Sequence, residues 1–231
     1  MPDRPKLNRE RVLRAALALA DEGGIEALTM RRLGQALAVE AMSLYNHVAG
    51  KDDVLDGLVD LVFAEIEVPC AGGDWSAAMR GRALSARAAL TRHRWAVGLM
   101  ESRHHPGPAN LGHHDAVLRC LREAGFSLVM AGHAYSALDS YVYGFAMTQL
   151  NLPFDTGEQA AEVAATILPA SLADTYPHLA EFAIQRVMQP GYSYADEFEF
   201  GLDLILEGLE KEKPLEPAGV EDRVGDPGHQ R

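Results

Sequence analysis

The chain has 231 residues, 48% of them hydrophobic, which is enough for one large domain or two modest ones around a sizeable core. No apolar run reaches the roughly 18 residues of a membrane span, and the acidic Asp3 and Glu10 are foreign to a secretory signal, so we expect a cytoplasmic protein outside the membrane. The only cysteines, Cys70 and Cys120, are too few for a metal cluster, and we interpret both as packing residues.

The formal net charge of −12 is distributed unevenly along the chain. Residues 1–51 carry eight Lys and Arg against six Asp and Glu, whereas residues 52–231 carry thirteen against twenty-seven. A slightly basic segment ahead of an acidic one fits a protein that contacts phosphates at one end only, although chance produces such a distribution equally well.

Helical periodicity dominates the chain without convincing strand alternation or an internal repeat, and this predicts an all-α fold. The first fifty residues predict three short helices, over residues 8–23, 29–37 and about 40–47. Asn8 and Thr29 are suitable N-caps for the first two, Gly23 and Gly24 end the first, and a tight turn at Ala38 separates the last two.

A fourth helix, over residues 51–67, connects this N-terminal unit to the rest of the chain. Asp52 and Asp53 lie in its first turn, where the helix dipole favours anions. Beyond a break at 68–74, further helices are predicted over residues 75–92, 95–102, 109–124, 127–150, 157–168, 176–188 and 195–211.

We therefore expect an N-terminal domain over residues 1–51, a larger helical domain over residues 68–212 and a disordered tail, rich in Pro, Gly and charge, over residues 213–231. Three short helices with a three- to four-residue turn between the second and third are typical of a helix-turn-helix motif, whose third helix lies in the major groove of DNA. Small helical bundles that bind nothing share this spacing, so it does not establish DNA binding alone.

The sequence TMRRLGQALAVEAMSLYNHVAGK, residues 29–51, resembles the TetR family of bacterial repressors. The features in common are a Thr-capped helix, a Leu-Tyr-x-His/Tyr-hydrophobic run and a Lys that opens the next helix. Residues 125–144 (GFSLVMAGHAYSALDSYVYG) and 198–212 (FEFGLDLILEGLEKE) are similar to the two dimerisation helices of the tetracycline-repressor branch. The likeness covers most of residues 8–212 except 152–193. It implies a homodimeric repressor that binds a double-stranded DNA operator and a small-molecule effector, with no cofactor and no enzymatic activity.

The resemblance also assigns DNA contacts. Thr29, Tyr45 and Lys51 would bind phosphates, unless Tyr45 only packs, and the forked guanidinium of Arg31 would read guanine. Arg32 is expected to face phosphate or solvent. The base-reading face would consist of Ala41, Met42, Ser43, Asn46 and His47. Family members usually have glycine where this chain has Ala38, and alanine there costs about 1 kcal/mol if the position needs a positive φ.

Two apolar stripes are expected to form a four-helix interface between subunits. One stripe consists of Leu128, Ala131, Leu138, Val142 and Phe145. The other consists of Phe198, Leu202, Ile205 and Leu209, flanked by Gly201 and Gly208, which would let a partner helix approach closely. The alternative is that both stripes face the core of their own chain.

An apolar effector cavity with a few polar groups is expected between the helix that follows the linker and the dimerisation helices. Its candidate residues are Phe63, Ile66, Arg82, Ala86, Met100, Arg103, His104, His113, Val117, Tyr135 and Asp139. Tetracycline repressors hold a magnesium-chelated drug with His, Asn and Gln, and these positions fall near Met100, Arg82 and Val117 here. We therefore expect a largely apolar organic effector that needs no metal, to which Arg82 offers donors for a carboxylate or carbonyl if it points inward.

Two rival functions remain, a metal-dependent enzyme and a ligand-binding protein with a vestigial head. Histidine pairs at 104–105 and 113–114 suggest the first, but adjacent histidines rarely ligate one ion, and no HExxH, GxSxG, P-loop or dinucleotide motif is present. The intact Thr29, Tyr45 and Lys51 argue against the second, which a test for specific DNA binding would settle.

Overall fold

The computed structural model describes residues 6–70, 72–167 and 171–213, and every regular element in these ranges is helical. The predicted all-α fold is therefore confirmed. The tail predicted over residues 213–231 lies outside the described residues apart from Lys213, as does the last residue of the helix predicted at 157–168.

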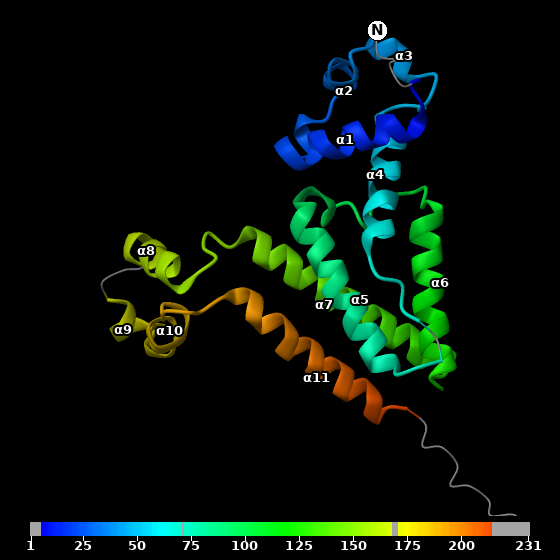
Figure 1. Cartoon of the computed structure of the whole chain (residues 1–231). Helices are drawn as coiled ribbons and strands as arrows, with labels where there is room; N and C mark the ends of the chain where they lie inside the picture. The colour runs from blue at the N-terminus through cyan, green and yellow to red at the C-terminus, as the bar shows by residue number, and fades with distance from the viewer. Residues whose placement is uncertain (1–5, 71, 168–170, 214–231) are drawn as a thin grey trace, which may run out of the picture.

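The head, residues 6–50, consists of three helices at one end of the molecule (Figure 1). These are α1 (Arg9–Gly23), α2 (Met30–Leu37) and α3 (Ala41–Leu44). Asn8 and Thr29 cap α1 and α2 as predicted, since each side chain accepts a hydrogen bond from a backbone N–H three residues ahead. Leu33, Leu44 and Val48 are buried in the small core of the head.

Two features of the head differ from the prediction. Only Ala41–Leu44 is α-helical in the third helix, and residues 45–47 continue as turns. A short 3₁₀ helix, η1 (Ile25–Ala27), fills the interval between α1 and α2. Short helices of this kind have too few residues to show a hydrophobic period in the sequence.

A single helix, α4 (Lys51–Glu65), runs from the head into the body, residues 66–213, and ends near the position predicted for it (Figure 1). The body is built on four longer helices: α5 (Trp75–Arg92), α6 (Pro108–Glu123), α7 (Leu128–Asn151) and α11 (Glu197–Lys211). Helix α4 packs against α5 and α6, while α5 packs against α7 and α11. These helices enclose one continuous hydrophobic core.

Other predicted helices of the body are divided into shorter pieces. The helix predicted over 95–102 is the 3₁₀ turn η2 (Arg94–Ala96) followed by further turns. The helix predicted over 176–188 is α10 (Pro177–Phe182) continued by the π-helical turn η3 (Ala183–Val187), and η4 (Tyr194–Asp196) precedes α11.

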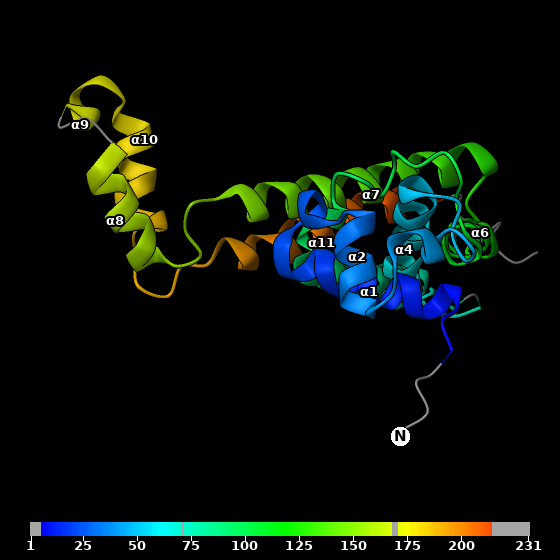
Figure 2. The same cartoon turned by 90° about the horizontal axis from the view of Figure 1, so that it is seen from above.

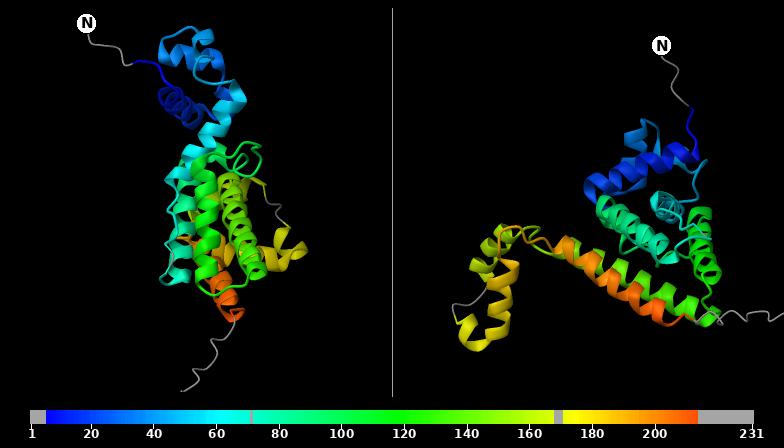
Figure 3. Two further views of the ribbon diagram at one scale, coloured as in Figure 1. Left: turned by 90° about the vertical axis from the view of Figure 1, so that its right-hand side faces the viewer. Right: turned by 60° about the horizontal axis from the view of Figure 1, so that its bottom comes forward.

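An arm formed by α8 (Gly157–Ile167), α9 (Leu172–Thr175) and α10 projects away from the body (Figures 2 and 3). A cavity of about 200 Å³ inside it has an almost wholly apolar lining. Ile167, Phe182 and Ile184 are exposed on this arm. Within the described chain, the arm thus presents apolar side chains that the body does not cover.

The turn between α2 and α3 contains the only non-glycine residue with positive φ in the described chain, Ala38 at φ 54° and ψ 46°. Its N–H closes α2 by bonding to the carbonyl oxygens of Gly34 and Gln35. Because the Cβ of an L-residue is strained in this left-handed region, Ala38→Gly is expected to raise the free energy of unfolding by about 1 kcal/mol in urea denaturation followed by circular dichroism.

The matched control is Ala36→Gly, which lies two residues earlier on an exposed position inside α2. Ala36→Gly is expected to lower the free energy of unfolding by about 1 kcal/mol, because glycine is less favourable than alanine inside a right-handed helix. If Ala38→Gly lowered the free energy of unfolding as much as Ala36→Gly does, the backbone strain proposed at Ala38 would be contradicted.

Candidate DNA-binding face and effector site

The outer surface of α2, α3 and the start of α4 carries the residues predicted to contact DNA. Thr29, Arg31, Arg32, Met42, Tyr45, Asn46 and Lys51 are exposed, and Ala41, Ser43 and His47 are partly exposed. Met42 is the extreme case, with 75% of its surface open to solvent. Leu44 is completely buried and anchors α3, so the remaining side chains of α3 are directed outward.

The close approach of α2 and α3 depends on Gly34. A Cβ at this position would lie 3.0 Å from the carbonyl oxygen of Val39 and 3.2 Å from the backbone of Ala41. The carbonyl of Gly34 also accepts a hydrogen bond from Val39 N at 2.9 Å. The turn is therefore tight and rigid, which holds α3 at a fixed angle to α2.

Cations on this face are available for phosphates. Within the described chain, no ion pair engages the guanidinium groups of Arg31 and Arg32 or the ammonium group of Lys51. By contrast, Arg9 is paired with Asp53 and Arg14 with Glu10. Arg31, Arg32 and Lys51 are thus exposed cations without an ion pair in the described chain, which suits contacts with phosphates.

A second group of functional side chains lies inside the body. Arg82 of α5 forms an ion pair with Asp139 of α7 at 2.5 Å, and only 3% and 9% of the two side chains are exposed. Arg82 Nε donates to His113 Nε2 of α6 at 2.9 Å. Three helices therefore meet at one buried guanidinium, which points inward rather than into solvent.

The protonation of His113 follows from these contacts. Burial and the neighbouring Arg82 charge lower the pKa of His113 to about 3, so its ring is neutral at physiological pH. Since Nε2 accepts from Arg82, the single ring proton resides on Nδ1. That N–H is buried and has no partner among the described residues.

Three more buried polar atoms share this condition. Arg82 Nη1, Asp139 Oδ2 and the hydroxyl of Tyr143 have no hydrogen-bond partner within the described chain, whereas Asp139 Oδ1 faces Arg82. Burial and the nearby Asp139 raise the pKa of Tyr143 above its ordinary value, so the phenol stays protonated. We call Arg82, His113, Asp139 and Tyr143 the buried polar cluster. Such atoms normally find a partner, which makes the cluster a candidate ligand site.

Most predicted effector residues lie in or around this part of the core. Phe63 packs beside His113 with ring centroids 5.6 Å apart, and Tyr135 hydrogen-bonds His114 at 2.5 Å. Ile66, Ala86, Met100 and Val117 are buried in the same hydrophobic core. Tyr143 was missed by the sequence analysis, although its position four residues after Asp139 on one helix is a signal that could have found it.

Two of the predicted effector residues do not join the cluster. Arg103 pairs with Asp52 and Asp56 on α4 instead. His104 is exposed in the loop before α6. Among the described residues, no group of three or more His, Cys, Asp or Glu is arranged to hold a metal ion. No described helix is both long and apolar enough to cross a membrane.

The predicted dimer stripes face the core of their own chain. Ala131, Leu138, Val142 and Phe145 of α7 and Phe198, Leu202 and Leu209 of α11 are all buried there, and Ile205 packs against the same core. The alternative stated from the sequence is therefore correct for these residues. Gly201 admits the ring of Tyr141 from α7 of the same chain, not a partner helix.

A different set of apolar side chains on these two helices is exposed. They are Leu128, Val129 and Met147 on α7, and Phe200 and Leu204 on α11. The assignment of the two stripes to the dimer interface was wrong, because a hydrophobic period shows that one face of a helix is buried but not whether the same chain or a partner covers it. Only Leu128, which is 71% exposed, belonged to the predicted stripes.

Comparison with known proteins identifies the family of this chain. The family model for bacterial regulatory proteins of the tetR family matches residues 12–58, and the model for the tetracyclin repressor-like C-terminal domain matches residues 69–213. The chain is 34% identical to the HTH-type transcriptional repressor DrrR1 of Streptomyces coeruleorubidus, over 90% of this chain and 78% of that one. It is also 34% identical to the class C tetracycline repressor of Escherichia coli, over 89% and 92%.

Solved structures indicate the same family. The Streptomyces coelicolor TetR family protein ActR, in complex with actinorhodin, superposes with a TM-score of 0.73 and 28% identity over 90% of this chain and 98% of ActR. Homodimers are typical of the family. The relatives are transcriptional repressors rather than enzymes, so the metal-dependent enzyme is not favoured. The chain belongs to the TetR family of ligand-responsive, DNA-binding transcriptional repressors.

Proposed function

We propose that this chain binds a roughly palindromic operator as a homodimer, through the exposed face of the head, and is released when a small organic molecule enters the buried polar cluster. The observation that carries the effector half is the set of four buried polar atoms without partners, contributed by three different helices. The function divides between residues 1–51, which bind DNA, and residues 68–212, which bind the effector and the partner subunit. The regulator acts in the cytoplasm, where the operator DNA is.

In the DNA complex, the phosphate contacts come from Thr29, Tyr45 and Lys51, with Arg32 beside them, and Arg31 reads a guanine. The side chains that enter the major groove are Ala41, Met42, Ser43, Asn46 and His47. Two heads of a dimer then need a separation of about 34–36 Å, one turn of DNA, to read both half-sites.

The chemistry of the effector follows from the buried polar cluster. Asp139 already neutralises Arg82, so the effector need not be an anion. Arg82 Nη1 and His113 Nδ1 are hydrogen-bond donors without an acceptor, whereas Asp139 Oδ2 is an acceptor without a donor. A carbonyl next to a hydroxyl on a largely apolar ring system supplies both. ActR, which was solved in complex with actinorhodin, and the class C tetracycline repressor are relatives whose names include a small organic molecule.

The effector acts through α4. Phe63, near the end of α4, contacts His113, so a ligand at the cluster meets the helix that carries the head. A ligand that binds better when the heads are spread shifts the dimer toward a spacing that does not fit the operator. The size of the shift equals its differential affinity for the two spacings.

DNA recognition is tested by comparing two cations. Lys51→Ala is expected to weaken binding to all sequences alike and to reduce the slope of log affinity against log salt by about 1. Arg31→Ala is expected to cost roughly 1–3 kcal/mol on a selected operator and to relax one base preference. Both are measured by fluorescence anisotropy on an operator selected from random DNA.

Arg14→Ala is the control, because Arg14 is exposed on the head but paired with Glu10. It should bind like the unmodified protein. An unchanged affinity and salt slope in Lys51→Ala would remove Lys51 from the phosphate contacts.

Effector chemistry is tested by operator release with a panel of hydroxylated aromatic ketones and quinones, and with tetracycline plus magnesium, each with and without EDTA. Release by members of the panel is expected to persist in EDTA, because Met100 and Val117 offer magnesium no ligand. His113→Phe is expected to abolish release while leaving operator affinity intact. Release by the tetracycline–magnesium complex alone, lost in EDTA, would contradict the proposed cavity chemistry.

Dimerisation is tested at two neighbouring leucines of α11. Leu204 is exposed and Leu202 is completely buried. Leu204→Glu is expected to give a folded monomer in light scattering, whereas Leu202→Glu should destabilise the subunit itself because it buries a charge in the core. Leu111→Glu, exposed on α6, is the control and should remain dimeric. A dimeric Leu204→Glu would place the interface elsewhere.

A further inference from the structure

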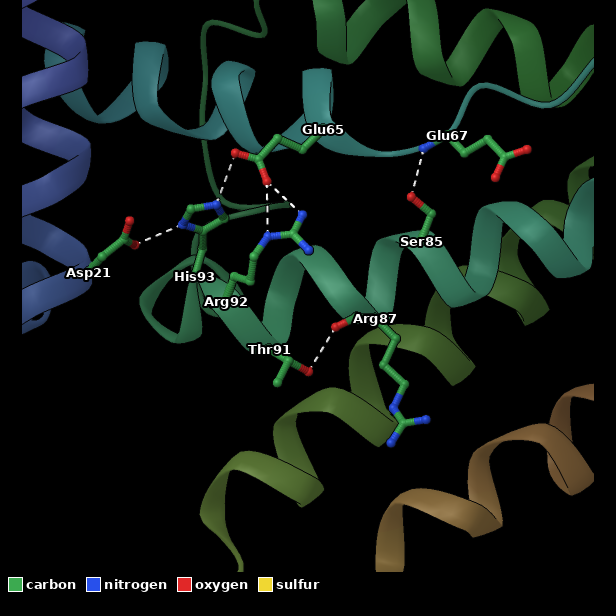
Figure 4. A network of polar contacts seen from close by, with 8 residues as sticks. All are labelled: Asp21, Glu65, Glu67, Ser85, Arg87, Thr91, Arg92 and His93. Atoms are coloured by element: carbon green, nitrogen blue, oxygen red, sulfur yellow. Dashed lines mark hydrogen bonds and ion pairs between the residues drawn. The ribbon is translucent and has the colours of Figure 1, made fainter.

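A histidine connects the head to the body at a point remote from α4's first turn. His93 lies at the C-cap of α5 and is buried. Its Nδ1 faces Asp21 Oδ1 of α1 at 2.7 Å, and its Nε2 faces Glu65 Oε1, the last residue of α4, at 3.1 Å (Figure 4). One imidazole therefore lies between a carboxylate of the head and a carboxylate at the far end of the connecting helix.

The neighbouring groups hold both carboxylates in place. Trp95 Nε1 donates to Asp21 Oδ1 at 2.8 Å, and Arg92 Nη2 donates to Glu65 Oε2 at 2.7 Å. Burial alone would raise the pKa of Glu65. The hydrogen bonds that Glu65 accepts from Arg92 and His93 nevertheless hold this pKa below its usual range. Both carboxylates are thus positioned as acceptors for the ring.

The surrounding segment joins the two hydrophobic cores. Trp95 and Leu99 pack against the core of the head and also against that of the body. The charged groups around His93 are Asp21 from α1, Glu65 from α4, Arg92 from α5 and Arg94 from η2, of which Arg94 reaches away to the carbonyl of Leu150. The polar contacts of His93 form one edge of this junction.

We propose that His93 is a positioning residue that clasps the DNA-reading head to the body by donating to Asp21 and Glu65 at once. We call these three residues the head clasp. A ring with a proton on each nitrogen serves both carboxylates, whereas a neutral ring donates to only one of them.

The head clasp gives the effector a second route to the head. Arg82 of the buried polar cluster and His93 lie on the same helix, α5, so a shift of α5 around a ligand moves Asp21 directly through His93. This consequence rests on the proposed repressor function, but the clasp itself does not. It joins α1 to α5 without passing through α4's N-terminal half.

The test is hydrogen exchange of the full-length dimer, followed by mass spectrometry. In His93→Gln, exchange in the C-terminal half of α1 is expected to rise roughly tenfold above that of the unmodified protein, because an amide cannot donate in two opposite directions. Protection within α6 and α7 should persist in this variant.

Asp21→Ala is the second variant, since Asp21 sits near the helix end and alanine keeps the helix. It should also raise exchange in the C-terminal half of α1. Glu22→Ala, the exposed neighbouring position, and His178→Gln, whose side chain is 98% exposed on the arm, should both behave like the unmodified protein.

Exchange in α1 of His93→Gln and Asp21→Ala equal to that of the unmodified protein would overturn the clasp. The measurement uses neither DNA nor effector, so a failure of the repressor function leaves its result readable.

Discussion

The architecture depends on one helix that belongs to two hydrophobic cores. Val54, Leu55 and Leu58 of α4 are buried in the core of the head, whereas Val59, Val62 and Phe63 are buried in the core of the body. The two sets follow each other along one helix without a linker, and Leu61 still packs against the core of the head. Bending α4 there would open one core or the other, and a close-packed interior resists such changes. The head therefore moves only when α4 moves as a rigid rod.

The same constraint gives meaning to the buried polar cluster. Placing Arg82 and Asp139 together in the core contributes little net stability, because desolvation offsets most of their attraction. An apolar pair of similar volume would serve the fold equally well. The cluster also leaves four polar atoms without partners among the described residues, which a purely structural network would avoid. Its presence at the meeting point of α5, α6 and α7, against Phe63 of α4, is explained by a ligand that completes it and displaces the rod.

The sequence predicted the head better than the body, for identifiable reasons. Caps such as Asn8 and Thr29 act locally, so they locate helix ends without knowledge of the fold. The stripe containing Leu202 showed that one face of α11 is buried, but a period carries no information on whether the covering helix belongs to the same chain. The turns after Ala96 were predicted as helix, because the sequence does not reveal that η2 contacts α1 and that Leu99 packs against the cores of both head and body. Arg82 was identified as a candidate, yet its neutralisation by Asp139 required the fold.

The two attachments of the head together restrict how it can move. Helix α4 enters the head beside α3, while the head clasp holds the opposite end of the assembly, at the C-terminal part of α1. These attachments favour rotation of the head about the line between them, and such a rotation would move α3 relative to the α3 helix of a partner subunit. Both attachments lead back to helices of the buried polar cluster, α4 through Phe63 and the clasp through α5. A small displacement of these helices around the ligand can therefore change the spacing between the two α3 helices of a dimer. An operator of fixed length binds only when this spacing matches the distance between its two half-sites.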